Sequence, residues 1–130
     1  MARGRRPPSC PCGNPVFAAC CGPLLSGEAP AADAEALMRS RYTAYAHGDR
    51  DYLLASWHPR TRPDGVEIDP ACKWIGLTVH AHRAIDDDHA EVRFTARYRL
   101  GGRAHRLSEH SRFERLDGRW YYLDGRVRED

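Results

Sequence analysis

HAEVRFTARYRL, at residues 89–100, is the stretch that decides the fold. Its apolar residues alternate with polar ones: Val92, Phe94, Ala96 and Tyr98 fall on one face, and Arg93, Thr95, Arg97 and Arg99 on the other. A period of two residues predicts a β-strand that buries one face and exposes the other to water. The next stretch, RAHRLSEHSRFERL at residues 103–116, alternates in the same way after Gly101 and Gly102. We therefore expect two antiparallel strands joined by a tight turn.

Two further strands flank this pair. Residues 74–85 precede it, with Ile75, Leu77 and Val79 on one face, and the three aspartates at positions 86–88 form the turn. Residues 119–124 follow it, after Asp117 and Gly118. The pattern predicts a four-stranded antiparallel meander.

The segment before the strands has a helical pattern. A helix is expected from Asp33, its N-cap, to His47, and its apolar face consists of Leu37, Met38, Tyr42 and Tyr45. The opposite, polar side consists of Glu35, Arg39 and Arg41. Gly48 ends this helix, a second short helix is expected over residues 49–58, and residues 60–71 predict a loop. Helices followed by a meander with one apolar face give an α+β domain, whose curved sheet encloses a cone against the helices.

Four of the five cysteines lie near the N-terminus, at Cys10, Cys12, Cys20 and Cys21. They form two short pairs, separated by a Gly-Asn-Pro turn at residues 13–15 and by residues 16–19, which are expected to make a short helical turn. Zinc takes four tetrahedral ligands and prefers thiolates. The cluster therefore predicts one structural Zn²⁺ ion in a small zinc knuckle, residues 1–27, ahead of a main domain at residues 28–130.

Two other interpretations of the cysteines fit the sequence less well. A disulfide framework is typical of secreted chains, and a bridge between the neighbours Cys20 and Cys21 would need a strained ring. A lipoprotein signal needs a continuous apolar run, but residues 6–16 contain four prolines, an asparagine and two cysteines. We therefore expect no export signal. The protein is expected in the cytoplasm, where the reducing environment keeps the thiolates free.

The charge pattern limits the classes of partner. The net charge is only +2, and no apolar run approaches the length of a membrane span. Residues 93–128 contain ten arginines and four acids, so the last strands are basic. Arginine on the solvated face of a sheet explains this excess better than a nucleic-acid site, because the face lacks interleaved aromatic residues. Neither nucleic acid nor a membrane is an expected partner.

One acidic residue is predicted to point inward. Leu107, Glu109, Ser111 and Phe113 share a face of the third strand. The two hydrophobic members mark that face as the inner one. A buried carboxylate needs a partner or a raised pKa. Glu109 therefore either makes a structural hydrogen bond, to Tyr42, Trp74 or a helical arginine, or serves as an acid or base in a pocket.

Several short segments of the sequence, in the same order, resemble the YchJ family (UPF0225), a bacterial family of unestablished role. They are EALMRSRYTAY at residues 35–45, DYL at 51–53, WHP at 57–59, WIGL at 74–77, SRF at 111–113 and WYYLDG at 120–125. The resemblance implies an NTF2-like cone preceded by a SEC-C type zinc motif, similar to the one at the C-terminus of the SecA motor. By position, it implies the same four zinc ligands.

The chain departs from the SEC-C pattern in two ways. Seven residues, not the usual eight, separate Cys12 from Cys20, and the usual basic run is replaced by Gly-Asn-Pro-Val-Phe at residues 13–17. We expect Arg3, Arg5 and Arg6 to replace part of the positive charge of that basic run. Many relatives carry a second cysteine motif after the NTF2-like domain, but residues 73–130 contain no cysteine.

Two classes of function follow. In the first, the protein is an interaction module that docks on a protein partner through its zinc knuckle, and a homodimer through the sheet is a further expectation. In the second, the cone holds a small molecule, as in NTF2-like isomerases, dehydratases and hydrolases. The candidate catalytic residues are Glu109 and His58, and the expected pocket residues are Tyr42, Trp57, Trp74, Tyr98 and Ser111. The first class is favoured, because no second polar group can be aimed with Glu109 at one atom from the sequence.

Overall fold

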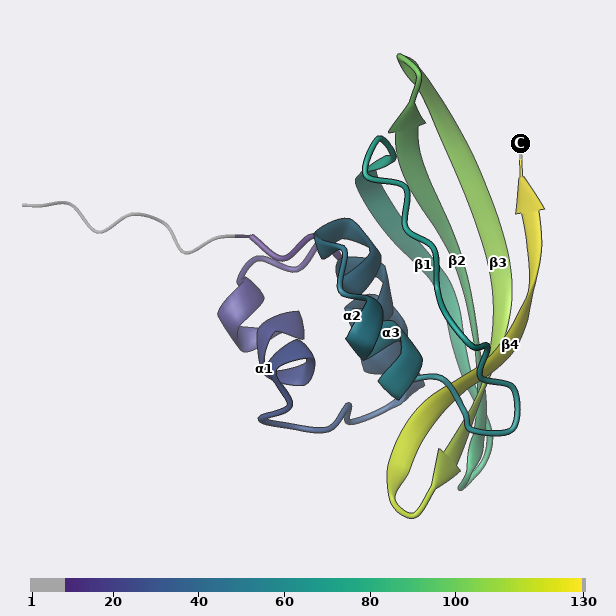
Figure 1. The fold of residues 1–130 in the computed structure, drawn as a ribbon. Helices are drawn as coiled ribbons and strands as arrows, with labels where there is room; N and C mark the ends of the chain where they lie inside the picture. Colours follow the sequence, from purple (N-terminus) through teal and green to yellow (C-terminus); the bar gives the residue numbers. More distant parts are fainter. Residues whose placement is uncertain (1–8, 130) are drawn as a thin grey trace, which may run out of the picture.

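A computed structural model describes residues 9–129 of the chain (Figure 1). The helical elements come first: η1 (Phe17–Ala19), α1 (Cys21–Ser26), α2 (Ala34–His47) and α3 (Arg50–Ala55). The strands follow: β1 (Lys73–Asp86), β2 (His89–Leu100), β3 (Arg103–Leu116) and β4 (Arg119–Glu129). Their order in the sheet is β1-β2-β3-β4, with every neighbour antiparallel. The predicted α+β architecture is confirmed.

Helix α2 lies between the knuckle and the sheet. In Figure 1 the curved sheet stands on one side of α2, and η1 and α1 lie on the other. Helix α2 contacts α1 as well as β1, β2 and β4. One hydrophobic cluster therefore joins Cys10, Cys12 and Cys21 to Leu37 and Met38 of α2. The division between residues 27 and 28 stays a prediction, and Arg3, Arg5 and Arg6 lie outside the described residues.

Both ends of α2 lie where the sequence predicts them. Asp33 accepts a hydrogen bond from the backbone N–H of Ala36 at 2.8 Å, and Gly48 ends the helix with φ = +74°. A carboxylate at the N-cap satisfies a free backbone N–H, and glycine adopts this left-handed backbone without steric cost. The expected helix is thereby confirmed to within one residue.

The placement of Arg41 on the polar side of α2 is wrong. Its side chain is buried, with the residue only 6% exposed. The sequence pattern assumed that a single face of the helix is covered, whereas α2 is covered by the knuckle and α3 as well as by the sheet. Arg41 finds hydrogen-bond partners in the segment after α2, which a helical pattern does not reveal.

The placement of Ile75 on the same face as Leu77 and Val79 is also wrong. Its side chain is 49% exposed, because β1 contains a register shift between Trp74 and Gly76. Such a β-bulge adds a residue to one strand and reverses the faces of the residues around it. Trp74 therefore points inward before the bulge, and Leu77 and Val79 pack against the core after it.

Two elements differ in length from the prediction. Helix α3 ends at Ala55 rather than near residue 58, because Trp57 pairs with Tyr122 as an isolated bridge. The backbone N–H of His58 also donates to the carbonyl of Tyr122 at 2.8 Å. Strand β4 continues to Glu129 rather than ending at residue 124, which places Val127 opposite Glu109 on β3.

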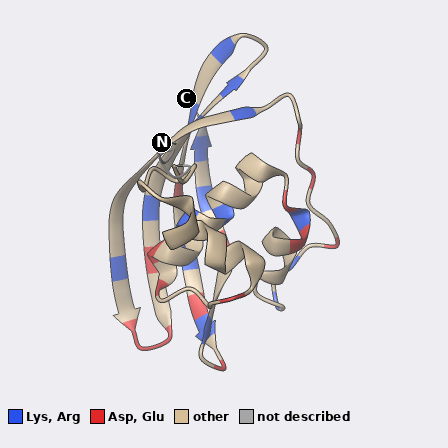
Figure 2. Ribbon diagram, turned by 90° about the vertical axis from the view of Figure 1, so that its left-hand side faces the viewer, with Lys and Arg blue, Asp and Glu red and all other residues tan. Residues whose placement is uncertain are grey.

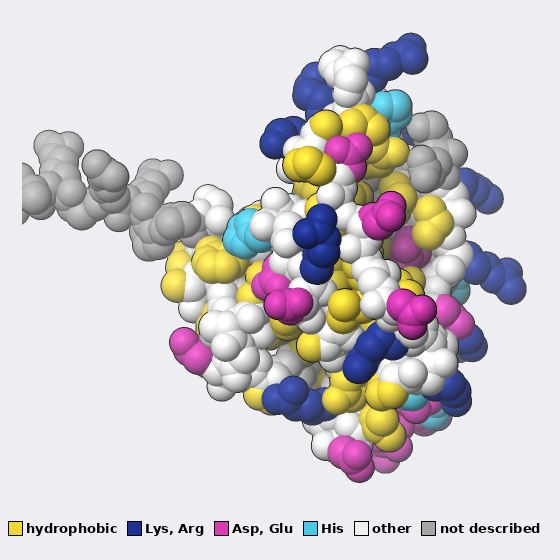
Figure 3. Space-filling model, in the orientation of Figure 1, with side chains coloured by type: hydrophobic (Ala, Val, Ile, Leu, Met, Phe, Trp, Pro, Cys, Tyr) yellow, Lys and Arg dark blue, Asp and Glu magenta, His cyan; other side chains and the backbone are white. Residues whose placement is uncertain are grey.

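The basic residues of the strands lie on the solvated surface. Lys and Arg recur along the strands in Figure 2, and all ten arginines of residues 93–128 are exposed. In Figure 3 they line the outer side of the sheet, whereas residues 9–27 contain no charged side chain. None of the helices among residues 9–129 is long and apolar enough to cross a membrane.

Candidate metal centre and cone cavity

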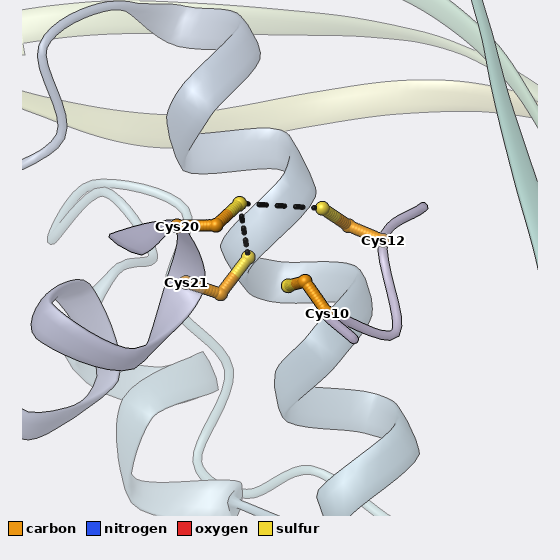
Figure 4. Close-up of side chains that lie close together, drawn as sticks. All are labelled: Cys10, Cys12, Cys20 and Cys21. Carbon is orange, nitrogen blue, oxygen red and sulfur yellow. Dashed lines mark hydrogen bonds between the residues drawn. The ribbon is translucent and has the colours of Figure 1, made fainter. Parts of the chain in front are cut away.

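The four N-terminal cysteines meet at one point (Figure 4). All four Sγ atoms lie within 4.8 Å of one another. Two of the separations are 3.5 Å, between Cys12 and Cys20, and 3.7 Å, between Cys20 and Cys21. A tetrahedron with Zn–S bonds of about 2.3 Å has S–S edges of about 3.8 Å, whereas a disulfide needs about 2.05 Å. The spacing fits four ligands of one zinc ion, and the cysteines are free thiols.

Two tight turns bring the pairs together. The backbone N–H of Gly13 donates to the carbonyl of Cys10 at 3.0 Å, and Gly13 has φ = +106°, a conformation that favours glycine. The predicted helical turn before the second pair is η1. A Cβ at Gly22 would lie 2.9 Å from the carbonyl oxygen of Phe17 in η1. Glycine at position 22 therefore allows α1 to start directly beside η1, with Cys20 and Cys21 at the junction.

Polar groups around the cluster orient the sulfur atoms. The side-chain amide of Asn14 donates to Sγ of Cys20 at 3.1 Å. Two contacts come from α2: Oγ1 of Thr43 lies 3.7 Å from Sγ of Cys10, and Nη1 of Arg39 donates to the carbonyl of Cys12 at 3.0 Å. Hydrogen bonds of this kind fix the ligands of a metal and offset the negative charge of thiolates.

The thiols influence one another's protonation. The hydrogen bond from the Cys21 thiol lowers the pKa of Cys12 to about 4. The same bond raises the pKa of Cys21, and burial raises the pKa of Cys20. Several thiolates at this spacing repel one another and need a positive charge between them. The donor set fits Zn²⁺, which deprotonates bound thiols.

The site is closed. Cys10, Cys12 and Cys21 are at most 3% exposed, and Cys20 is half-buried. Four protein ligands leave no open coordination position for a substrate, which is typical of structural rather than catalytic zinc. The assignment of the four cysteines as zinc ligands stays a prediction.

A second feature, the cone cavity, lies between α2 and the concave face of the sheet. Its volume is about 320 Å³. Of the predicted site residues, those that line it are Tyr42, Trp57, Trp74, Glu109 and Ser111. Val127, which is 52% exposed, belongs to the same wall, so the cavity opens to solvent near the end of β4.

Two predicted site residues do not line this cavity. His58 is buried on another side of the fold, where its Nε2 lies 2.9 Å from Oε1 of Glu114. Tyr98 lies next to Trp74 and stacks on the ring of His105, with ring centroids 5.1 Å apart. The structure therefore does not bring His58 and Glu109 together. The distance of His58 from the cavity follows from its backbone bond to β4, which the sequence did not reveal.

Glu109 points into the cavity as the alternation predicts. Its Oε2 accepts hydrogen bonds from Oγ of Ser111 and from the hydroxyl of Tyr122, the latter at 3.2 Å. Neither Tyr42, Trp74 nor a helical arginine is its hydrogen-bond partner among the described residues. Gly125 on β4 makes room for the carboxylate, because a Cβ there would lie 2.5 Å from Oε2. Burial, and then the charge of Glu109, raise the pKa of Tyr122.

Arg41 is a cavity residue that the sequence pattern placed on the polar side of α2. Its guanidinium lies against two aromatic rings that contact each other, 4.9 Å from the ring centroid of Trp57 and 4.5 Å from that of Tyr122. Its Nη1 donates to the carbonyl of Leu53 at 2.8 Å and to Oγ of Ser56 at 2.6 Å. Burial lowers the pKa of Arg41. Trp57 and Tyr122 lie far from it in the sequence, so local spacing gave no signal of this position.

Comparison with known proteins agrees with this architecture. Residues 33–125 match a family described as "YchJ, middle NTF2-like domain". The chain belongs to the YchJ (UPF0225) family. A UPF0225 protein of Methylibium petroleiphilum is 52% identical over 93% of this chain and 90% of its own length. One of Chromobacterium violaceum is 54% identical over 92% of this chain and 93% of its own length.

Two solved structures of SEC-C motif containing proteins resemble this chain. A SEC-C motif containing protein from Rhodopseudomonas palustris superposes with a TM-score of 0.82 at 35% identity, covering 92% of this YchJ-family chain and 98% of that one. Another, from Psychrobacter arcticus, gives a TM-score of 0.77 at 27% identity, covering 89% and 80%. The predicted family and the NTF2-like fold behind a cysteine motif are thus confirmed.

Proposed function

We propose that this YchJ-family protein is a cytoplasmic protein-interaction module whose knuckle is held by one structural zinc ion. The observation that carries the proposal is the convergence of four thiols within 4.8 Å against helix α2. The knuckle has little regular structure of its own: η1 spans three residues and α1 six. A segment this small usually needs a metal or disulfides to hold one conformation. Zinc would therefore fix its surface for a partner.

An apolar groove beside the knuckle supports a binding role. It has a volume of about 320 Å³ and lies between α1, the segment after it, α3 and the start of β4. Leu24 and Leu25 line one side and Trp120 lines the other, with Asp49 and Asp51 at α3. Residues 9–27 carry no charge, so we propose an apolar contact with the partner rather than the electrostatic one that basic SEC-C motifs would offer.

Affinity capture from a bacterial lysate tests the interaction role. We would compare the wild-type protein with a Cys20→Ser/Cys21→Ser double variant and with Leu24→Asp, which places a charge in the groove. Ala71→Asp is the matched control, because Ala71 is exposed in the loop before β1 and does not line the groove. We expect specific partners to be lost with the first two variants and kept with the control. Identical capture lists for all four proteins would contradict the docking role.

Ligand binding in the cone cavity is a second candidate function. The observation that favours it is the carboxylate of Glu109 beside the hydroxyl of Tyr122 in an accessible, aromatic-lined cavity. A carboxylate in such a cavity can act as a general base. The catalytic form of this proposal predicts deuterium uptake from D₂O at the α-carbon of small carbonyl compounds. Glu109→Gln should abolish that uptake, and equal uptake by the variant would contradict a catalytic Glu109.

The proposed location and oligomeric state rest on separate observations. Four closely spaced free thiols suit a reducing compartment, which supports a location in the cytoplasm.

Exposed hydrophobic residues along the strands support a homodimer through the sheet; they are Ile75, Ile85, Leu100, Leu116 and Val127. Light scattering of the purified protein measures the mass, and a monomer at micromolar concentration would contradict the dimer.

A further inference from the structure

One wall of the cone cavity offers positive charge and N–H donors without matching acceptors. Arg41 lies in that wall and is only 6% exposed. Its Nη1 hydrogens bind the uncharged oxygens of Leu53 and Ser56. A guanidinium has five N–H donors, and those on Nε and Nη2 make no hydrogen bond to any residue between 9 and 129. The buried charge therefore lacks a direct counterion among the described residues.

The neighbouring tryptophan has a buried donor without an acceptor. The indole Nε1 of Trp57 is buried and has no hydrogen-bond partner in the described part of the chain. The Trp57 ring lies against the Arg41 guanidinium at 4.9 Å. Buried donors without acceptors are rare in native proteins, because each costs free energy unless a ligand or water satisfies it. The orphaned indole N–H of Trp57, together with the guanidinium donors of Arg41 that have no protein acceptor, marks a place for an acceptor that carries negative charge.

The opposite wall has the complementary character. The carboxylate of Glu109 already accepts from two hydroxyls, those of Ser111 and Tyr122. A carboxylate has about four acceptor positions, so Glu109 can accept a further hydrogen bond from a ligand. Glu109 and Arg41 line the same cavity without forming an ion pair within the described residues. A molecule between them would meet a cation at one end and an acceptor at the other.

The space between these polar ends is aromatic. Tyr42, Tyr45, Trp74 and Phe94 line it, and the cavity of about 320 Å³ falls within the range of small-molecule sites. An apolar or aromatic ligand body would pack against these rings.

We infer that the cone cavity binds a small aromatic carboxylate, with its carboxylate on Arg41 and a hydroxyl donating to Glu109. This inference rests on the second candidate function and names its ligand class, and it requires neither catalysis nor a protein partner. An amine is the opposite choice, because aromatic rings and a carboxylate also attract cations. The rings of Trp57 and Tyr122, however, are already occupied by the Arg41 guanidinium, and Glu109 already accepts two hydrogen bonds. The N–H donors without a protein acceptor lie at the Arg41 and Trp57 end of the cavity, which favours an anion there.

The three tryptophans make the inference directly measurable. Trp57 and Trp74 line the cone cavity, whereas Trp120 lines the groove beside the knuckle. We would titrate the full ¹⁵N-labelled protein with 4-hydroxyphenylacetate and follow the three indole N–H signals by NMR. The signals of Trp57 and Trp74 should shift in a saturable way, and that of Trp120 should not.

Comparison ligands identify which group is recognised. Phenylacetate lacks the hydroxyl and should bind several-fold more weakly, and tyramine, which replaces the carboxylate by an amine, should bind most weakly. Tighter binding of tyramine would overturn the ligand class while leaving the cavity as a ligand site. Absence of a saturable shift with all three at millimolar concentration would overturn the inference, and the capture experiment would still decide the interaction role separately.

Variants locate the two ends of the ligand. Arg41→Gln should weaken binding of 4-hydroxyphenylacetate on the order of 10- to 100-fold, the usual effect of losing a charge-assisted hydrogen bond. Arg41→Lys keeps the charge and should recover part of that loss. Because substitution of a buried arginine can impair folding, Glu109→Gln provides a second test: it should abolish the preference for 4-hydroxyphenylacetate over phenylacetate. An unchanged preference with folded Glu109→Gln, or unchanged affinity with folded Arg41→Gln, would contradict the proposed orientation.

Discussion

The knuckle and the cone cavity lie on opposite sides of helix α2 and are built in opposite ways. In the knuckle, four like groups converge on one point and are closed off from solvent. In the cavity, the cation of Arg41 and the carboxylate of Glu109 lie apart in a space that is open to solvent. A closed set of identical ligands serves to hold structure, whereas separated opposite charges leave room for a guest. The two faces of helix α2 thus contact two sites of different character, a closed thiol cluster and an open cavity with separated charges.

The largest expected effect is loss of a knuckle ligand. Cys12 is fully buried, and Cys12→Ser removes one thiolate from the set. We expect the variant to lose zinc and several kcal/mol of stability, because the binding free energy of structural zinc contributes to folding. Thermal unfolding with parallel zinc analysis measures both. Cys72→Ser, outside the cluster, is the matched control and should change neither. Full zinc content in Cys12→Ser would contradict the role of Cys12 as a zinc ligand, and with it the contrast between the knuckle and the cavity.

Loss of Arg41 should have the next largest effect. Arg41→Ala removes the side chain packed against Trp57 and Tyr122 and leaves the oxygens of Leu53 and Ser56 without their donor. We expect a loss of about 2–4 kcal/mol in urea unfolding. Arg93→Ala, on the exposed face of β2, should stay within about 0.5 kcal/mol. Equal effects of the two variants would show that Arg41 is not part of the core.

Two glycine substitutions compare the regions on equal terms, and the larger effect is expected in the knuckle. In Gly22→Ala the new Cβ would meet the backbone oxygen of Phe17 at 2.9 Å. Backbone cannot move aside as a side-chain end can, so η1 must shift. We expect a loss of about 1–3 kcal/mol together with weaker zinc retention against a chelator. Gly65→Ala, where no atom lies within 4 Å of the new Cβ, is the control.

The smallest effect is expected at Gly125. The Cβ in Gly125→Ala would meet the carboxylate of Glu109, which is the end of a flexible side chain and can turn away. We expect a stability loss of no more than about 1 kcal/mol, but weaker binding of 4-hydroxyphenylacetate in the NMR titration. A loss of stability as large as that in Gly22→Ala would show that the cavity is as rigid as the knuckle.

The sequence predicted what depends on neighbouring residues. The alternation at residues 89–116 gave β2 and β3 with their bounds and the inward position of Glu109, and the short cysteine pairs predicted a cluster that the structure brings together. Each of these patterns is formed by residues that lie close together in the sequence, so it can be recognised without the tertiary fold.

What the sequence did not predict depends on distant contacts. Arg41 is buried because Trp57, Tyr122 and Ser56 meet around it, and only the fold brings these residues together. Ile75 is exposed because of a bulge in β1 that the apolar run does not signal. His58 was expected in the cavity but is held by β4 beside Glu114. The cavity was therefore harder to predict than the knuckle, since its residues come from all parts of the domain.

The central claim is that the four cysteines hold one zinc ion. X-ray absorption spectroscopy of protein purified without chelator, combined with elemental analysis, tests it most directly. The account predicts one zinc per chain with four sulfur neighbours at about 2.3 Å. A zinc content far below one per chain, or a first shell with fewer than four sulfur atoms, would contradict it.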